Sequence, residues 1–76
     1  MDDRHAIRVS AHITHLFDGH AFATDEFGVT YFILPSHFEQ SQPAAFADLR
    51  LGSEVLFTPI QHPKGKRAIE ILLVRR

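Results

Sequence analysis

The chain has 76 residues, enough for one small domain with a thin core. It has no Cys, which excludes disulfides and thiolate metal sites, and its 45% of hydrophobic residues is typical of a globular protein rather than a disordered one. The formal net charge of −1 argues against binding duplex nucleic acid through bulk charge, but it leaves open a local basic patch or binding by stacking.

The first ten residues, MDDRHAIRVS, are charged and contain no apolar run, so we expect no secretory signal. No stretch approaches the ~20 apolar residues of a membrane-spanning helix. The absence of Cys fits a reducing compartment. We therefore expect a soluble cytoplasmic protein with a single domain over residues 1–76.

Three strands are predicted in the first half of the chain. Residues 9–14 alternate apolar and polar side chains, which is the period of a half-buried strand. Asp18-Gly19 is a strong hairpin signal, because Gly accepts a positive φ. His20–Thr24 alternates again, and a second turn follows at Asp25–Gly28. Val29–Leu34 is β-branched and aromatic, so a third strand completes a meander.

The second half begins with an irregular connection over residues 35–52, with one helical turn expected around Ala44–Ala47. Glu54–Ile60 is predicted as a fourth strand and Ala68–Val74 as a fifth, with a basic turn at His62–Lys66 between them. A meander, a long crossing and a hairpin predict an all-β, five-stranded antiparallel closed barrel. This is the layout of the oligonucleotide-binding fold (OB-fold).

Side-chain spacing also predicts which residues pack. We expect Val55 and Phe57, which share one face of the fourth strand, in the core, and Ile69 and Ile71 share a face of the fifth strand. Aromatic residues that flank turns are expected to pack rather than to bind; these are Phe17, Phe27 and Phe38.

Two segments resemble the motifs of the cold-shock domain family. Asp18–Ala23, DGHAFA, aligns with a family motif of the form K-G-F-G-F-I, and Thr30–Pro35, TYFILP, aligns with D-V-F-V-H-F. The spacing between the two motifs matches the family without an alignment gap. Further matches are Phe46, Leu49 and Gly52 to F-x-x-L-x-x-G, Val55–Phe57 to V-x-F, and Lys64-Gly65 with Ala68 to G-x-x-A. The resemblance covers roughly residues 9–74 and implies an OB-fold barrel of the cold-shock type.

The resemblance also implies a function, because exposed rings of this family stack on the bases of single-stranded RNA or DNA. The positions that it carries over to this chain are His20, Phe22, Phe32, Leu34 and Phe46. The chain departs from the family pattern where Asp18 replaces a Lys, Leu34 a His and Pro35 an aromatic residue, and where the usual Trp of the first strand is missing.

The residues alone leave the direction of these rings open. Periodicity by itself places Phe22 in the core, whereas the family pattern turns its small neighbours inward and Phe22 outward. Phe32 faces outward if Tyr31 and Ile33 line the core. Phe46 is explained equally well as a loop ring that closes over a base and as a plug at the bottom of the barrel.

A compact basic cluster follows the fourth strand. Lys64, Lys66 and Arg67 either contact phosphate beside the rings or form an ordinary solvated loop tip. The six His residues would add positive charge to such a surface as the pH falls toward ~6.5. We include the three basic residues among the candidate nucleic-acid-binding residues.

Two further histidines lie near the predicted ring positions. The first predicted hairpin places His15 across from Phe22, and Phe17 across from His20. A bulge in the first strand would bring His12 to the same outer side as His20. We therefore count His12 and His15 as candidate binding residues. The spacing of the histidines matches no known metal site, so we expect no metal and no cofactor.

The sequence contains no recognisable catalytic constellation. The Ser residues lack the context of a nucleophile elbow, the adjacent Asp25 and Glu26 diverge in a turn, and no Gly-rich phosphate loop is present. We therefore expect a binding module and not an enzyme.

Two functions remain. The first is a module that binds single-stranded RNA or DNA, with a role as an RNA chaperone or in adjusting gene expression under stress, as the resemblance implies. The second is a barrel of the same fold with reduced nucleic-acid affinity that uses its apolar face for a protein partner or for self-association. The replacements at Asp18, Leu34 and Pro35 favour the second.

Overall fold

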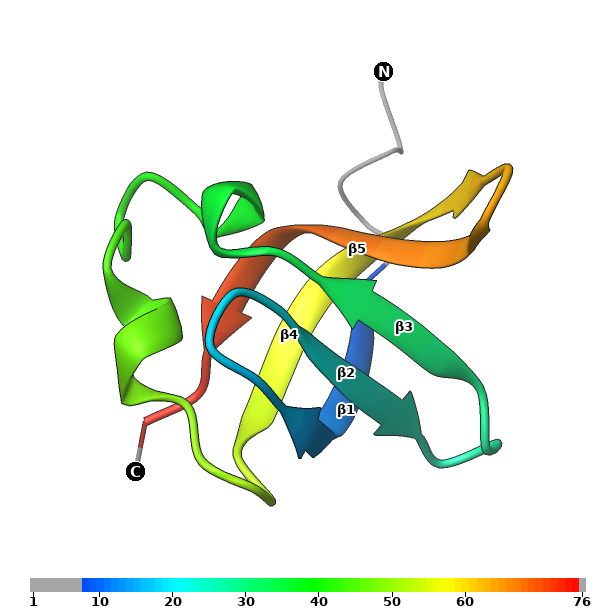
Figure 1. Ribbon diagram of the computed structural model, residues 1–76, viewed down its shortest axis with the longest axis horizontal. Coiled ribbons are helices and arrows are strands. Elements are labelled where there is room, and N and C mark those ends of the chain that lie inside the picture. Colours follow the sequence, from blue (N-terminus) through cyan, green and yellow to red (C-terminus); the bar gives the residue numbers. More distant parts are fainter. Residues whose placement is uncertain (1–7, 76) are drawn as a thin grey trace.

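The computed structural model describes residues 8–75. They form five strands and two short 3₁₀ segments, in the order β1 (Val9–Leu16), β2 (Ala21–Asp25), β3 (Thr30–Ile33), η2 (Pro35–His37), η3 (Ala45–Asp48), β4 (Glu54–His62) and β5 (Gly65–Leu73) (Figure 1). In this part of the chain no helix is both long and apolar enough to cross a membrane. The charged start of the chain, MDDRHAI, on which the expectation of no secretory signal rests, lies outside the described residues.

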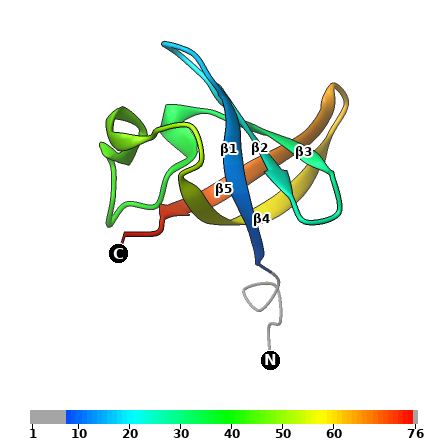
Figure 2. The same cartoon turned by 90° about the horizontal axis from the view of Figure 1, so that it is seen from below.

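The strands close into a barrel in the order β1-β2-β3-β5-β4, and β4 pairs back onto β1 (Figures 1 and 2). The predicted all-β, five-stranded barrel is therefore confirmed, and it is consistent with an OB-like fold. The prediction of a purely antiparallel sheet is wrong, because β3 and β5 run in the same direction and pair at Phe32 and Arg67. A closed ring with an odd number of strands must contain a parallel pair of neighbours, and a parallel pair needs a long crossing connection.

Alternation along the strands fills the barrel. The buried apolar residues are Ala11, Ile13, Ala21, Ala23, Tyr31, Ile33, Phe38, Ala45, Leu49, Val55, Phe57, Ala68, Ile71 and Leu73. The two Ala side chains of β2 leave room for the large rings of Tyr31 and Phe57, whose centroids lie 4.9 Å apart. The prediction that Val55 and Phe57 lie in the core is confirmed, and Tyr31 and Ile33 also line the core, which was the condition for an outward Phe32.

Two irregularities shift the alternation of the strands. In β1 the register changes between Ile13 and His15, so the irregularity on which the outer position of His12 depended is present. In β5 Glu70 has a φ of +53°, and Ala68 and Ile71 are both buried although they are three residues apart. The prediction that Ile69 and Ile71 share a face is wrong, because the extra residue at the bulge moves Ile69 to the half-buried side.

The long connection closes one end of the barrel and covers the free edge of β5. Phe38 forms a parallel bridge with Ile71, and the Gln42 side-chain amide holds the backbone of Leu73 by two hydrogen bonds. The helical turn expected near Ala44 is present as η3, a 3₁₀ turn. The expected packing role of Phe38 is confirmed, since it is 8% exposed.

The two turns of the meander differ in their backbone conformation. In the first, the backbone N–H of Phe17 donates to the carbonyl of His20, and Gly19 does not take the positive φ that the hairpin signal predicts. In the second, Gly28 has a φ of +83°, and its N–H donates to the carbonyl of Asp25. The left-handed residue of the meander is therefore Gly28, at the β2–β3 turn.

Candidate nucleic-acid interface

A row of side chains crosses the outside of four strands. His15 pairs with Phe22, Phe22 pairs with Phe32, and Phe32 pairs with Arg67, so the row runs from β1 through β2 and β3 to β5. The ring centroids of His15 and Phe22 lie 6.1 Å apart and those of Phe22 and Phe32 5.5 Å apart. The guanidinium carbon of Arg67 lies 5.3 Å from the centre of the Phe32 ring, within reach of a cation–π contact.

Both Phe rings of this row point outward because the inner positions are taken. Their strand neighbours Ala21, Ala23 and Ile33 are completely buried. Phe22 and Phe32 are half-buried, so each ring has one open side. The core position that periodicity alone predicts for Phe22 is therefore wrong. The outward orientation of Phe22 that the family pattern implies is confirmed.

Two rings from the β1–β2 loop extend the row. Phe17 stacks on His20, with centroids 4.6 Å apart and an interplanar angle of 20°. His20 in turn lies 5.7 Å from Phe22 and 5.6 Å from Phe32. Phe17 is 49% exposed, so its predicted packing role is wrong. The predicted pairing of Phe17 with His20 was the signal that could have identified it.

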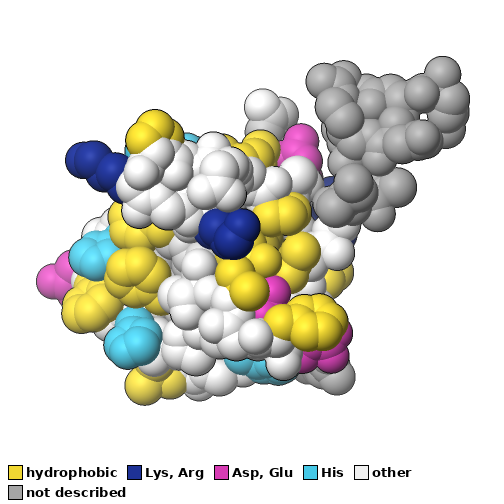
Figure 3. All heavy atoms as spheres, turned by 90° about the vertical axis from the view of Figure 1, so that its right-hand side faces the viewer, with side chains coloured by type: hydrophobic (Ala, Val, Ile, Leu, Met, Phe, Trp, Pro, Cys, Tyr) yellow, Lys and Arg dark blue, Asp and Glu magenta, His cyan; other side chains and the backbone are white. Residues whose placement is uncertain are grey.

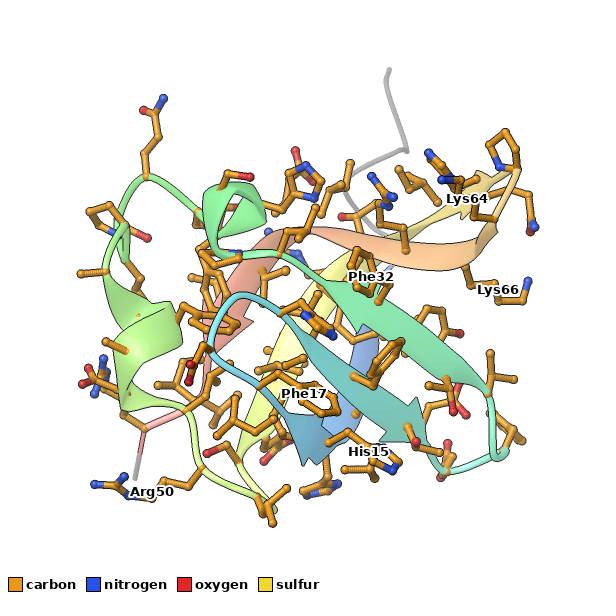
Figure 4. All side chains as sticks on the ribbon, in the orientation of Figure 1. His15, Phe17, Phe32, Arg50, Lys64 and Lys66 are labelled. Carbon is orange, nitrogen blue, oxygen red and sulfur yellow. The ribbon has the colours of Figure 1, made fainter. Side chains whose placement is uncertain are left out.

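We call this set of rings the aromatic surface; its members are His15, Phe17, His20, Phe22 and Phe32. Figure 4 shows three of them, His15, Phe17 and Phe32, spread over the strands β1 to β3. In Figure 3 hydrophobic and His side chains lie side by side on one part of the molecule, with Lys and Arg side chains next to them.

A row of hydroxyl groups borders the aromatic surface. The Oγ1 atoms of Thr14 and Thr24 lie 3.0 Å apart, and those of Thr24 and Thr30 lie 3.1 Å apart, so one hydrogen-bonded chain crosses β1, β2 and β3. His12 pairs with Thr24 and is exposed. The structure therefore places His12 on the outer side, as predicted, but beside the hydroxyl groups and not among the rings.

The three predicted basic residues lie at the other border, on the β4–β5 hairpin. Lys64 and Lys66 are exposed, and Lys66 Nζ donates to Gln61 Oε1 at 3.3 Å. A hollow of about 330 Å³ separates the hairpin from the sheet. Phe22, Thr30 and Phe32 line it from the sheet, and His62, Lys64, Gly65, Lys66 and Arg67 line it from the hairpin.

Other predicted residues lie apart from the rings. Phe46 is half-buried against the core and makes an edge contact with Phe38, with ring centroids 6.3 Å apart, which is the arrangement expected of a plug. Leu34 is half-buried directly after β3. Phe27 is 82% exposed at the β2–β3 turn, so the prediction that it packs is wrong.

Asp25, the last residue of β2, accepts hydrogen bonds that hold the β2–β3 turn. Burial alone would raise the pKa of Asp25, but hydrogen bonds to its carboxylate from the N–H groups of Val29 and Phe27 and from the Tyr31 hydroxyl outweigh this effect and lower the pKa below 3.8. Burial, together with the hydrogen bond to Asp25 and its negative charge, raises the pKa of Tyr31 above 10.0. This network ties the β2–β3 turn to the core.

The arrangement combines half-exposed rings, hydroxyl groups and cations on one outer face, which suits contact with flat groups that carry negative charge. Within residues 8–75 no three His, Asp or Glu side chains gather closely enough to hold a metal ion. In comparisons with known proteins, the chain matches no family model and no curated protein sequence.

Proposed function

We propose that this protein binds single-stranded RNA or DNA by stacking bases on the aromatic surface. The observation that carries the proposal is the cross-strand row His15–Phe22–Phe32–Arg67, which places two Phe rings and a guanidinium side by side outside the core. Stacking of bases on such rings contributes ~1–3 kcal/mol per base and tolerates any sequence, because every base has a flat face.

The distribution of charge supports stacking over attraction by bulk charge. The net charge of −1 gives no general attraction for a polyanion. Three cations, Lys64, Lys66 and Arg67, nevertheless lie next to the rings. A strand whose bases lie on the rings would have its phosphates within reach of these cations, so charge would guide the backbone while the rings supply most of the affinity.

We further infer a module of the cold-shock type that acts in the cytoplasm as an RNA chaperone or a regulator of gene expression, and not as an enzyme. The barrel supports this inference, as do the outward positions of His20, Phe22 and Phe32, which the family motifs assign to base stacking. Phe46, in contrast, lies with the core, so the proposed surface does not include it.

The first test is a titration of a short, fluorescently labelled, pyrimidine-rich single strand, followed by anisotropy at low and high salt. The label must be on the nucleic acid, since the chain has no Trp. We expect micromolar or tighter binding that weakens only modestly with salt, because stacking depends little on ionic strength. Tighter binding at about pH 6 than at about pH 7.5 would bring histidines into the binding site.

Substitution of the rings tests the surface directly. The double variant Phe22→Ala/Phe32→Ala should bind at least about tenfold more weakly, since two lost base stacks of ~1–3 kcal/mol each exceed the ~1.4 kcal/mol that a tenfold change requires. Phe27→Ala is the matched control, because it removes an exposed Phe from the β2–β3 turn. Circular dichroism would verify folding, and a folded double variant that binds like the parent would refute the proposal.

A protein-binding or self-association module is the second candidate. It is favoured by the large apolar side chains that stay exposed, among them Phe17 at 49% and Leu51 at 68%. Mass measurement over a range of concentrations separates the two candidates. A protein that stays monomeric at high concentration and binds the labelled strand would support nucleic-acid binding. A dimer that does not bind the strand would support self-association.

A further inference from the structure

A wedge-shaped space opens between β3 and the first residues of β5. Within the described residues, these two strands pair at one position, Phe32 with Arg67, and Figure 1 shows them diverging from there toward the tip of the β4–β5 hairpin. The hollow of about 330 Å³ lies in this wedge. Its volume is at the lower end of the ~300–1,000 Å³ of small-molecule sites, so it has room for one small ligand and not for a folded segment.

One wall of the wedge is aromatic. Phe22 and Phe32 line it, and the Arg67 guanidinium, 5.3 Å from the centre of the Phe32 ring, extends the flat surface toward the hairpin. Thr30 also lines the hollow on this side, and its hydroxyl is hydrogen-bonded to that of Thr24. A flat heterocycle with polar edges fits this wall better than an aliphatic ligand does.

The opposite wall is cationic. Lys64 and Lys66 line it, next to Arg67 of the aromatic wall, and no Asp or Glu is among the residues that line the hollow. Among residues 8–75, none of these three side chains is in an ion pair. The N–H of Lys64 donates to Nδ1 of His62, so a neutral His62 carries its hydrogen on Nε2 and presents a further donor. Such a wall suits an anion, and phosphate above all.

We propose that the wedge is a binding site for a single nucleotide, with the base against Phe32 and the phosphate at Lys64 and Lys66. The inference rests on the proposed function, which it deepens by naming a discrete subsite at the hairpin end of the aromatic surface. It requires both walls, because the base and the phosphate of one nucleotide lie close enough together to contact Phe32 and the lysines at once. In Figure 4, Phe32 lies on β3, and Lys64 and Lys66 lie to its right on the β4–β5 hairpin.

The test is a titration of the full chain with adenosine 5′-monophosphate, followed by amide NMR spectra. The matched probes are adenosine, which has no phosphate, and inorganic phosphate, which has no base. We expect shifts that concentrate at Thr30, Phe32 and Lys64–Arg67, and an affinity for the nucleotide about fivefold or more above that for either probe. An affinity no higher than that for inorganic phosphate, or shifts confined to other residues, would overturn the proposal.

Charge-neutral variants locate the phosphate. Lys64→Gln/Lys66→Gln should weaken binding of the nucleotide about fivefold, the size of two partly exposed ion pairs, and leave the affinity for adenosine unchanged. Arg50→Gln is the matched control, because Arg50 is exposed and lies at the opposite side of the molecule from both lysines (Figure 4). Equal affinities of the double variant and the control would place the phosphate elsewhere and refute the site.

The labelled strand, titrated in parallel, separates this proposal from the previous one. If the strand binds and the nucleotide does not, the wedge is no subsite and the proposed function stands. If the nucleotide binds and the strand does not, the wedge is a nucleotide site and the proposed function fails. If neither binds, both proposals fail.

Discussion

The side chain of Gln42 makes hydrogen bonds to the backbone of β5 that a neighbouring strand would otherwise make. Its Oε1 accepts the N–H of Leu73 at 2.7 Å, and its Nε2 donates to the Leu73 carbonyl at 3.2 Å. Gln42→Ala would remove both bonds at a backbone whose own residue is 7% exposed. At ~0.5–1.5 kcal/mol for each hydrogen bond, the free energy of unfolding should fall by about 1–3 kcal/mol. Gln42→Glu keeps the acceptor and loses the donor, so its free energy of unfolding should lie between those of the parent and Gln42→Ala.

Urea denaturation followed by circular dichroism measures this loss, and the fluorescence of the buried Tyr31 provides a second probe. With a slope of ~1 kcal/mol per molar urea for a chain of this size, the midpoint should shift by about 1 M or more. Gln40→Ala is the matched control, because Gln40 is exposed two residues earlier in the same loop. If Gln42→Ala and Gln40→Ala unfold at the same midpoint as the parent, the amide of Gln42 does not stabilise β5.

Three further predictions concern the β2–β3 turn. The depressed pKa of Asp25 stabilises the fold above pH 3.8, and this contribution is lost as the pH falls through the folded-state pKa; urea midpoints of Asp25→Asn should therefore change less than those of the parent on acidification. The raised pKa of Tyr31 stabilises the fold below pH 10.0, and this is lost as the pH rises through the folded-state value, so Tyr31→Phe should lose less stability than the parent at alkaline pH. Gly28→Ala should lower the free energy of unfolding by ~1–2 kcal/mol, because its φ is +83° although nothing lies within 4 Å of an added Cβ; a midpoint unchanged in urea would contradict this.

Much of the fold could be predicted because alternation of apolar and polar residues with a period of two determines which side chains of a strand face the core. Ala11 and Ile13 in β1 and Val55 and Phe57 in β4 lie inside as their spacing predicts. Alternation fails where a residue is inserted. Nothing in the sequence of β5 marks Glu70 as the bulged residue, since its conformation is supported by tertiary contacts such as the hydrogen bond from the Thr58 hydroxyl.

The candidate site could be predicted in part. The outward direction of Phe22 and Phe32 required the comparison with a family pattern, because periodicity alone favours the core for Phe22 and the apolar run around Phe32 gives no parity signal. The position of Phe17 beside a turn predicts packing, whereas its place across from His20 in the hairpin is the signal that points to the stacked pair. Phe46 could not be assigned, because its contact with Phe38 joins two parts of an irregular connection whose path no local pattern determines.

The single pair between β3 and β5 also affects how the barrel opens. The other neighbouring strands are joined by ladders of four or more pairs, whereas Phe32 and Arg67 form the whole β3–β5 ladder within the described residues. Local unfolding starts where few hydrogen bonds must break, so hydrogen exchange should be fastest along this junction. A ligand held between the two strands would add contacts there, and its binding would slow the opening of the whole barrel.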